Sequence, residues 1–182
     1  MNTMSFGNYQ WSAWCGLDNE IAKQSVPDKP GIYEIRTDFE FGRLKGSSQI
    51  LSIGRAVPSL QKRLSKGRFS DLIKDLDRPE KWLFNANRIL EFHYIVTTSG
   101  EEAKWLEALR QWEYENEHWE LPPGNDRLEK AAIFRRIEQQ YGRFNESKLK
   151  ALLQQHQTTE KVASFLGIPY VIIDNLKVYW MV

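Results

Sequence analysis

The stretch that decides the fold is residues 31–56, which read GIYEIRTDFEFGRLKGSSQILSIGRA. Isoleucine, leucine and tyrosine recur in residues 31–36 and 49–53, a composition that favours β-strands. Gly42 and the Gly-Ser-Ser run at 46–48 lie between these two segments. Two short strands joined by a glycine-containing turn predict an antiparallel β-hairpin.

A third strand and a short helix extend this hairpin. Residues 88–96 are rich in isoleucine, valine and aromatic side chains, which predicts the third strand. Leu60 and Leu64 are spaced i, i+4 with basic residues beside them, which predicts an amphipathic helix over 58–64. We therefore expect an α/β (α+β) fold with a small three-stranded, mostly antiparallel sheet flanked by helices.

A long helix is predicted over residues 101–119. Thr98 or Ser99 can cap its N-terminus, and acidic residues in the first turn suit the positive end of the helix dipole. Pro122 lacks a backbone N–H and predicts the end of the helix. Three tryptophans spaced by seven residues are interpreted as a core-facing stripe: Trp105, Trp112 and Trp119.

Three regions are predicted along the chain: an N-terminal arm at 1–26, the main domain at 27–126 and a C-terminal helical module at 127–182. Within the module, residues 130–141 predict a helix, and residues 159–176 resemble a helix-turn-helix unit. The second helix of that unit offers almost no lysine or arginine to phosphates. A helical hairpin that packs on the main domain, or that joins two copies in a homodimer, is the alternative.

Composition narrows the class of protein. With 182 residues, 41% apolar and 27% charged, the chain lies in the globular range. A single cysteine, Cys15, cannot form an intramolecular disulfide, and no charged-then-apolar leader opens the sequence. No apolar run approaches the roughly 20 residues of a membrane span, and the three histidines lack the spacing of a zinc site. We expect a cytoplasmic protein.

Charge is unevenly distributed, although the net charge is only +1. Residues 43–70 hold basic side chains and no acidic ones, whereas acidic residues concentrate in 101–120. A basic strip of this kind favours contact with phosphate groups, and a solvated helix face is the alternative. The strip consists of Arg43, Lys45, Arg55, Lys62, Arg63, Lys66 and Arg68.

Five short motifs follow one another in a specific order. They are Gly31-Ile32-Tyr33, LSIGRA at 51–56, LQKRL at 60–64, Glu107 on the long helix, and Pro122-Pro123-Gly124-Asn125. This order resembles the catalytic domain of the GIY-YIG nuclease family, as found in excision-repair, homing and restriction enzymes. The resemblance covers roughly residues 27–125. It implies an endonuclease that hydrolyses DNA phosphodiester bonds with Mg²⁺ or Mn²⁺.

The resemblance also implies a role for each candidate residue. Glu107 would hold the divalent cation, because a carboxylate suits a hard ion that also binds water and phosphate oxygens. Arg63 would stabilise charge that develops on the phosphate, with Arg55 assisting. Tyr33 would position or deprotonate the attacking water, and a strand tyrosine packed in the core is the alternative. Asn125 would support the geometry of the site.

DNA is the partner that the resemblance implies for the basic strip. Lysine and arginine side chains neutralise phosphates without regard to sequence. The predicted DNA contacts are Arg43, Lys45, Lys62, Lys66 and Arg68.

A departure from the family pattern leaves other interpretations open. Ser52 stands where the family has its second tyrosine, so a catalytically silent DNA-binding or adaptor protein is the alternative function. A third function to consider is that of a protein-interaction module that uses the tryptophan-rich helix and the C-terminal module. Glu113 is the rival metal ligand, but it lies about 240° around the helix from Glu107, so the two cannot both point into one site.

Overall fold

The computed structural model of the protein describes residues 9–17, 24–65, 89–125, 137–139, 142, 144–166, 173–174 and 176–177. The chain divides into two compact units. The sheet unit spans Ser5–Glu129, and the C-terminal unit consists of Met1–Met4 with Lys130–Val182. Within the described residues, no helix is both long enough and apolar enough to cross a membrane.

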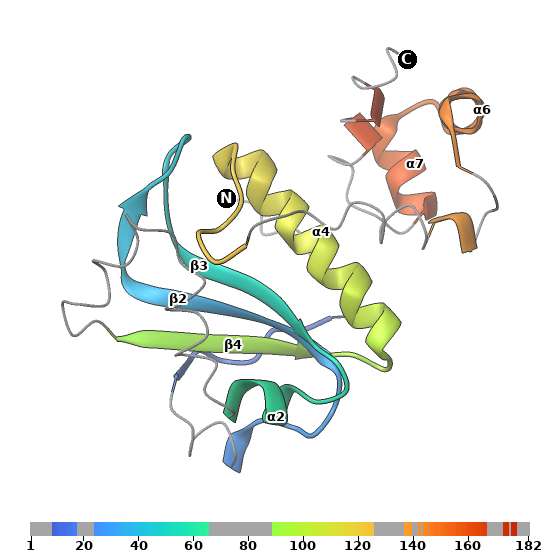
Figure 1. Ribbon diagram of the computed structural model, residues 1–182. Coiled ribbons are helices and arrows are strands. Elements are labelled where there is room, and N and C mark those ends of the chain that lie inside the picture. Colours follow the sequence, from blue (N-terminus) through green and yellow to red (C-terminus); the bar gives the residue numbers. More distant parts are fainter. Residues whose placement is uncertain are drawn as a thin grey trace. The chain divides into compact units, whose positions relative to one another are not determined.

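The described part of the sheet unit contains a four-stranded antiparallel sheet in the order β1-β4-β2-β3 (Figure 1). Its strands are β1 (Cys15–Gly16), β2 (Gly31–Gly42), β3 (Ser47–Ala56) and β4 (Leu90–Val96). The mixed α/β class is as predicted, but the predicted number of three strands is too low. The sequence gives no sign of β1, because a strand of two residues has no alternation.

The predicted hairpin is confirmed, with longer strands than expected. β2 and β3 pair antiparallel and are joined by a turn at residues 43–46. Gly46 in this turn has a φ of 73°, a left-handed conformation that favours glycine. Ser47 and Ser48, predicted to lie in the loop, continue the pairing with β2 instead.

Two described helices follow the hairpin: α2 (Leu60–Ser65) and α4 (Gly100–His118). Ser99 caps α4, because its side-chain oxygen accepts a hydrogen bond from the Glu102 N–H at 3.1 Å. The helix ends at Trp119, which has a left-handed backbone and a 67% exposed side chain. Trp112 is buried, as predicted for a core-facing stripe. Trp119 is exposed and lies just beyond the last helical residue, so the prediction is wrong for Trp119.

The helices α2 and α4 pack on opposite faces of the sheet (Figure 1). Tyr33 of β2 belongs to a buried cluster with Leu60 and Leu64 of α2. Glu34, the next residue of β2, contacts Arg110 of α4 instead. Because successive strand residues point to opposite faces, we refer to the α2 face, which carries Tyr33, and the α4 face, which carries Glu34.

Close packing explains why two of the motif positions are glycine. A Cβ atom at Gly31 would collide with the backbone carbonyl oxygen of Ile95 and with the side chain of Leu60. A Cβ atom at Gly54 would lie 2.6 Å from the Tyr33 hydroxyl oxygen. Glycine at these positions therefore lets β2 approach β4 and α2, and lets the Tyr33 ring lie across β3.

The C-terminal unit contains the helices α6 (Glu146–His156) and α7 (Thr159–Leu166), joined at Gln157 with a left-handed backbone. The side chains that they bury are Leu149, Leu152, Thr159, Val162, Ala163 and Leu166. Helix α7 coincides with the first helix of the predicted helix-turn-helix unit. The turn that should follow it at 167 lies outside the described residues, as does most of the predicted helix at 130–141.

Candidate active site

The phenol of Tyr33 is held on the α2 face at the end of β3. Its side chain is buried, at 1% exposure, and its ring lies against Gly54. The Nε of Arg63 in α2 donates a hydrogen bond to the Tyr33 hydroxyl oxygen at 3.3 Å. Arg63 itself is exposed to solvent, so this pair joins a buried phenol to an accessible guanidinium.

The carboxylate of Glu107 is held on the α4 face. Arg55 of β3 forms a charge-assisted hydrogen bond and ion pair with it through Nη1. The Glu107 side chain is 9% exposed and that of Arg55 is 32% exposed. Solvent or a ligand therefore approaches this pair from the arginine side.

Asn125 clamps the strand that carries Arg55. Its Oδ1 accepts a hydrogen bond from the Ile53 N–H at 2.9 Å, and its Nδ2 donates to the Ile53 carbonyl at 2.7 Å. The Gly124 N–H donates to the Leu51 carbonyl at 2.8 Å. Residues 124 and 125 thus act as a further partner along the outer edge of β3 and fix the backbone just before Gly54.

These contacts arrange the candidate residues in two pairs, Tyr33 with Arg63 and Arg55 with Glu107. Gly54 touches Tyr33, and Arg55 is the next residue, so the pairs meet at one dipeptide of β3. The Glu107 carboxylate reaches β3 from the face opposite to the one that carries the phenol. β3 is the last strand in the sheet order, and Gly124 and Asn125 cover its outer edge at Leu51 and Ile53, so a ligand that meets groups from both faces would lie further along, at Gly54 and Arg55.

A divalent cation has one candidate carboxylate here. Among the residues that the structure describes, no three histidine, cysteine, aspartate or glutamate side chains group as a metal site would require. Glu107 alone fits a hard ion that takes its remaining ligands from water and phosphate oxygens, as Mg²⁺ commonly does. Arg55 neutralises the Glu107 carboxylate and would share it with such an ion.

Glu113, the rival ligand, lies in a different environment. Its carboxylate is 3.5 Å from Nη1 of Arg110, and its Oε1 is buried without a hydrogen-bond partner in the described structure. Burial raises its pKa to about 7, and the neighbouring Glu34 and Glu117 add to the shift, although Arg110 opposes it. Glu113 belongs to a cluster on the α4 face and not to the Arg55–Glu107 pair.

That cluster centres on Glu34 and was not predicted. The Glu34 carboxylate accepts a hydrogen bond from Nε of Arg110 at 2.5 Å and lies 2.8 Å from Nε2 of His93. Burial opposes its ionisation, but Arg110 and His93 more than compensate, so the pKa of Glu34 lies below its ordinary value. We call Glu34, His93, Arg110 and Glu113 the Glu34 cluster.

Two tryptophans of the N-terminal arm cover the His93 side of the Glu34 cluster. Trp11 and Trp14 both stack on the His93 ring, with ring centroids 4.0 and 3.6 Å away. The Arg36 guanidinium lies 4.0 Å from the Trp14 ring centre in a cation–π contact. Perturbed carboxylates can mark an active site, but the burial of Glu34 beneath this cover favours a structural role.

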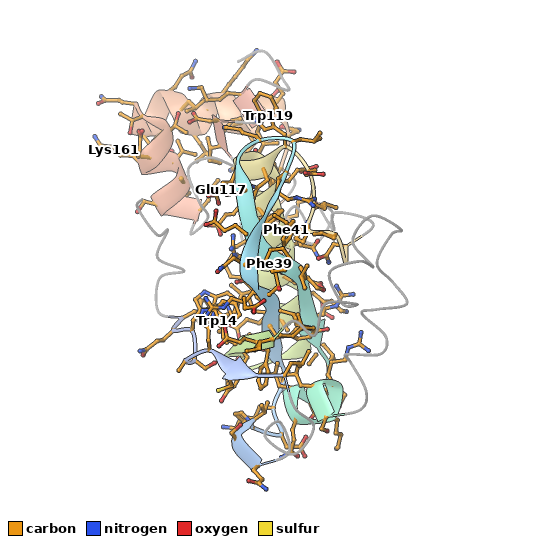
Figure 2. The ribbon with its side chains drawn as sticks, turned by 90° about the vertical axis from the view of Figure 1, so that its left-hand side faces the viewer. Trp14, Phe39, Phe41, Glu117, Trp119 and Lys161 are labelled. Atoms are coloured by element: carbon orange, nitrogen blue, oxygen red, sulfur yellow. The ribbon has the colours of Figure 1, made fainter. Side chains whose placement is uncertain are left out.

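The predicted DNA-contacting residues differ in how accessible they are. Arg43 is 6% exposed, pairs with Glu120 at 2.9 Å and donates to the Leu121 carbonyl at 2.7 Å. Its guanidinium therefore fastens the β2–β3 turn to the end of α4. Lys45 lies over the exposed Trp119 ring at 5.3 Å, beside the same turn (Figure 2).

Lys62 is exposed, as Lys45 is. Its side chain is 59% exposed and lies 3.7 Å from an equally exposed Asp28, a weak pairing in water. The remaining two predicted contacts, Lys66 and Arg68, lie outside the described residues.

No protein-family model, no curated protein and no solved structure matches this chain. The interpretation of the site therefore depends on its own residues. Its basis is the motif order in the sequence together with two contacting pairs, Arg63 with Tyr33 and Arg55 with Glu107, which lie on opposite faces of the sheet at Gly54 and Arg55.

Proposed function

We propose that the protein is a divalent-metal-dependent DNA endonuclease of the GIY-YIG type, which hydrolyses phosphodiester bonds. The observation that carries this proposal is the meeting of two residue pairs at Gly54 and Arg55 of β3, Tyr33 with Arg63 on the α2 face and Arg55 with Glu107 on the α4 face. They supply a phenol, two arginines and a carboxylate from β2, β3, α2 and α4. Phosphodiester hydrolysis needs this combination of an oriented water, cations for the phosphate and an anchor for a hard ion.

On the α2 face, Arg63 and Tyr33 act as one unit. The exposed Arg63 guanidinium presents its donors to a phosphate oxygen in a fixed planar arrangement. Its Nε also holds the Tyr33 hydroxyl, and the ring is kept in place by Gly54. The phenol is thus oriented without side-chain freedom, which is what positioning of a water molecule requires.

On the α4 face, Arg55 and Glu107 exchange partners when substrate arrives. Arg55 neutralises the Glu107 carboxylate in the free protein and, at about one-third exposure, can turn its guanidinium to the phosphate. A divalent cation bound to Glu107, water and phosphate oxygens would neutralise the charge that builds up on the phosphate and the leaving oxygen. The pair therefore holds the carboxylate beside a cationic group that the ion can replace.

The test is nicking of supercoiled plasmid and of branched or nicked DNA in Mg²⁺ or Mn²⁺. We expect Glu107→Gln and Arg63→Ala to lower the rate at least about 100-fold, the usual cost of one group that stabilises a transition state. Glu101→Gln is the matched control, because Glu101 is an exposed carboxylate two turns earlier on the same helix. Equal nicking by all four proteins would overturn the proposal.

A catalytically silent DNA-binding or adaptor protein is the second candidate function. The observation that favours it is Ser52, which is fully buried where the family carries a second tyrosine. DNA binding that weakens with salt, without cleavage by the unsubstituted protein under any metal, would support this alternative.

A further inference from the structure

Gln111 is a buried amide that is only partly used. It lies on α4 one turn after Glu107 and is 2% exposed. Its Nε2 donates a long hydrogen bond of 3.4 Å to the Ile53 carbonyl, which already accepts a 2.7 Å bond from Asn125. Its Oε1 is buried and has no hydrogen-bond partner among the described residues. A buried acceptor without a partner costs folding free energy, so its presence needs a reason.

The side chains of Gln111 and Glu107 lie in the same row between α4 and β3. Residues four apart on a helix are neighbours on one face, with Cβ atoms about 5–6 Å apart. Glu107 reaches Arg55, and Gln111 reaches Ile53, two residues earlier in the same strand. Residues two apart in a strand point to the same face. The unpartnered oxygen therefore belongs to the neighbourhood of the Glu107 carboxylate.

We propose that Gln111 is a positioning residue whose Oε1 accepts a hydrogen bond from a water molecule of the divalent ion held at Glu107. This inference rests on the proposed function. A small hard ion such as Mg²⁺ keeps several water ligands, and each of these waters has hydrogens to donate. Groups that accept such hydrogen bonds orient the hydrated ion and raise its affinity. A leucine or methionine would fill the same volume without an oxygen, so packing alone does not call for an amide.

The experiment is a Mn²⁺ titration of the 182-residue chain without DNA, followed by electron paramagnetic resonance. The proteins are the unsubstituted chain, Gln111→Met, Gln111→Glu and Glu107→Gln. Gln111→Met should weaken Mn²⁺ binding about tenfold, the usual cost of losing a group that supports a metal ligand. Gln111→Glu should tighten it, because a carboxylate accepts the same hydrogen bond more strongly.

Urea unfolding of the metal-free proteins is the second measurement. We expect Gln111→Met to be at least as stable as the unsubstituted chain, because it removes a buried acceptor that has no partner. A purely structural amide would show the reverse pattern, with lower stability and unchanged Mn²⁺ affinity, and that result would overturn the inference. If the substitutions leave the metal-free stability unchanged, the Mn²⁺ affinities alone decide.

The two proposals fail in different ways. Loss of Mn²⁺ binding in Glu107→Gln with unchanged binding in Gln111→Met would overturn the role of Gln111 alone. Absence of Mn²⁺ binding in the unsubstituted chain, or binding that is indifferent to Glu107→Gln, would overturn the metal site of the proposed function and the role of Gln111 with it.

Discussion

Two arginine–glutamate pairs join α4 to the sheet, and the acidic partner comes from the strand in one pair and from the helix in the other. In one pair the strand supplies Glu34 and the helix supplies Arg110. In the other the strand supplies Arg55 and the helix supplies Glu107, three residues earlier in α4. Only the second pair has a substantially exposed arginine, at 32% against 18%. The Glu34–Arg110 pair is therefore interpreted as structural, because it is largely shielded from solvent. The Arg55–Glu107 pair is accessible to a ligand, because Arg55 can turn outward.

The N-terminal arm shields the Glu34–Arg110 pair from solvent. Trp11 and Trp14 stack on His93, which completes the hydrogen bonding of the Glu34 carboxylate. An ion pair shut away from water contributes little net stability when intact, but it becomes costly when one partner is removed. The two pairs should therefore respond very differently to the loss of their carboxylates.

The largest expected effect is that of Glu34→Ala. It leaves Arg110 buried without its main partner, and we expect the free energy of unfolding to fall by about 3–5 kcal/mol. Glu107→Ala should cost less than about 2 kcal/mol, because Arg55 can turn toward water. Urea unfolding of both proteins, followed by circular dichroism, measures the difference.

A double variant, Glu34→Leu with Arg110→Leu, sharpens this comparison. It removes both charges and should recover most of the stability that Glu34→Ala loses. If Glu34→Ala and Glu107→Ala cost the same, solvent access does not distinguish the two pairs.

The next effect depends on pH and concerns Glu113. Its pKa is raised to about 7 in the folded protein by burial, against an ordinary value of 4.5. The folded state therefore binds more protons than the unfolded state between these values, and stability falls as pH rises from 4.5 to about 7. Glu113→Gln should remove this loss and stabilise the protein at pH 8 by about 1–3 kcal/mol.

The measurement is urea unfolding of both proteins at pH 4.5, 6 and 8. The stabilising effect of Glu113→Gln should be smallest at the lowest pH, where the carboxyl is protonated in the folded protein and about half protonated in the unfolded chain. Glu101→Gln, at an exposed carboxylate of the same helix, serves as control and should show no such trend. A gain that is equal at all three pH values would contradict the raised pKa.

A smaller effect is expected at Gly54, which supports the Tyr33–Arg63 pair. Gly54→Ala puts a methyl group 2.6 Å from the Tyr33 hydroxyl oxygen, so the ring must move. We expect a loss of about 1–2 kcal/mol in the free energy of unfolding, as for a crowded core position. The nuclease activity should fall much further, because the phenol leaves its place beside Arg63.

Gly42→Ala is the control for this substitution, since a Cβ atom there meets nothing within 4 Å. Nicking by Gly54→Ala at the rate of the unsubstituted protein would show that the position of the Tyr33 ring does not matter for cleavage.

The contrast between the two pairs also explains what sequence alone could supply. The three long strands and α4 follow from local signals, namely β-forming residues, a glycine turn and the Ser99 cap. Helix α6 is not among the predicted helices, although it has a local signal in Asn145, an N-cap residue that accepts a hydrogen bond from the Lys148 N–H. Strand β1 has no such signal, because its two residues acquire their role only by pairing with β4.

The Glu34 cluster could not be predicted for a related reason. A glutamate that alternates with buried residues in a strand suggests a solvent-facing side chain. Its partner Arg110 lies 76 residues away, and both become partners only because α4 covers that face. The family resemblance predicts three site residues, Tyr33, Arg63 and Glu107. Their division between the two faces of the sheet is seen only in the structure.

The smallest effect concerns two residues of the basic strip, the exposed Lys62 and Arg43, whose side chain is buried. Lys62→Ala removes an exposed side chain whose contact with Asp28 is weakened by water. If the protein binds DNA as proposed, this variant should weaken binding by a few-fold, lower the slope of log affinity against log salt by about one, and leave the unfolding curve unchanged. Arg43→Ala should act in the opposite way, because Arg43 is buried against Glu120 and the Leu121 carbonyl. It should lower stability while the salt dependence stays the same, since a guanidinium fastened inside the protein neutralises no phosphate. Equal salt slopes for Lys62→Ala and Arg43→Ala would mean that accessibility does not select the residues that meet DNA.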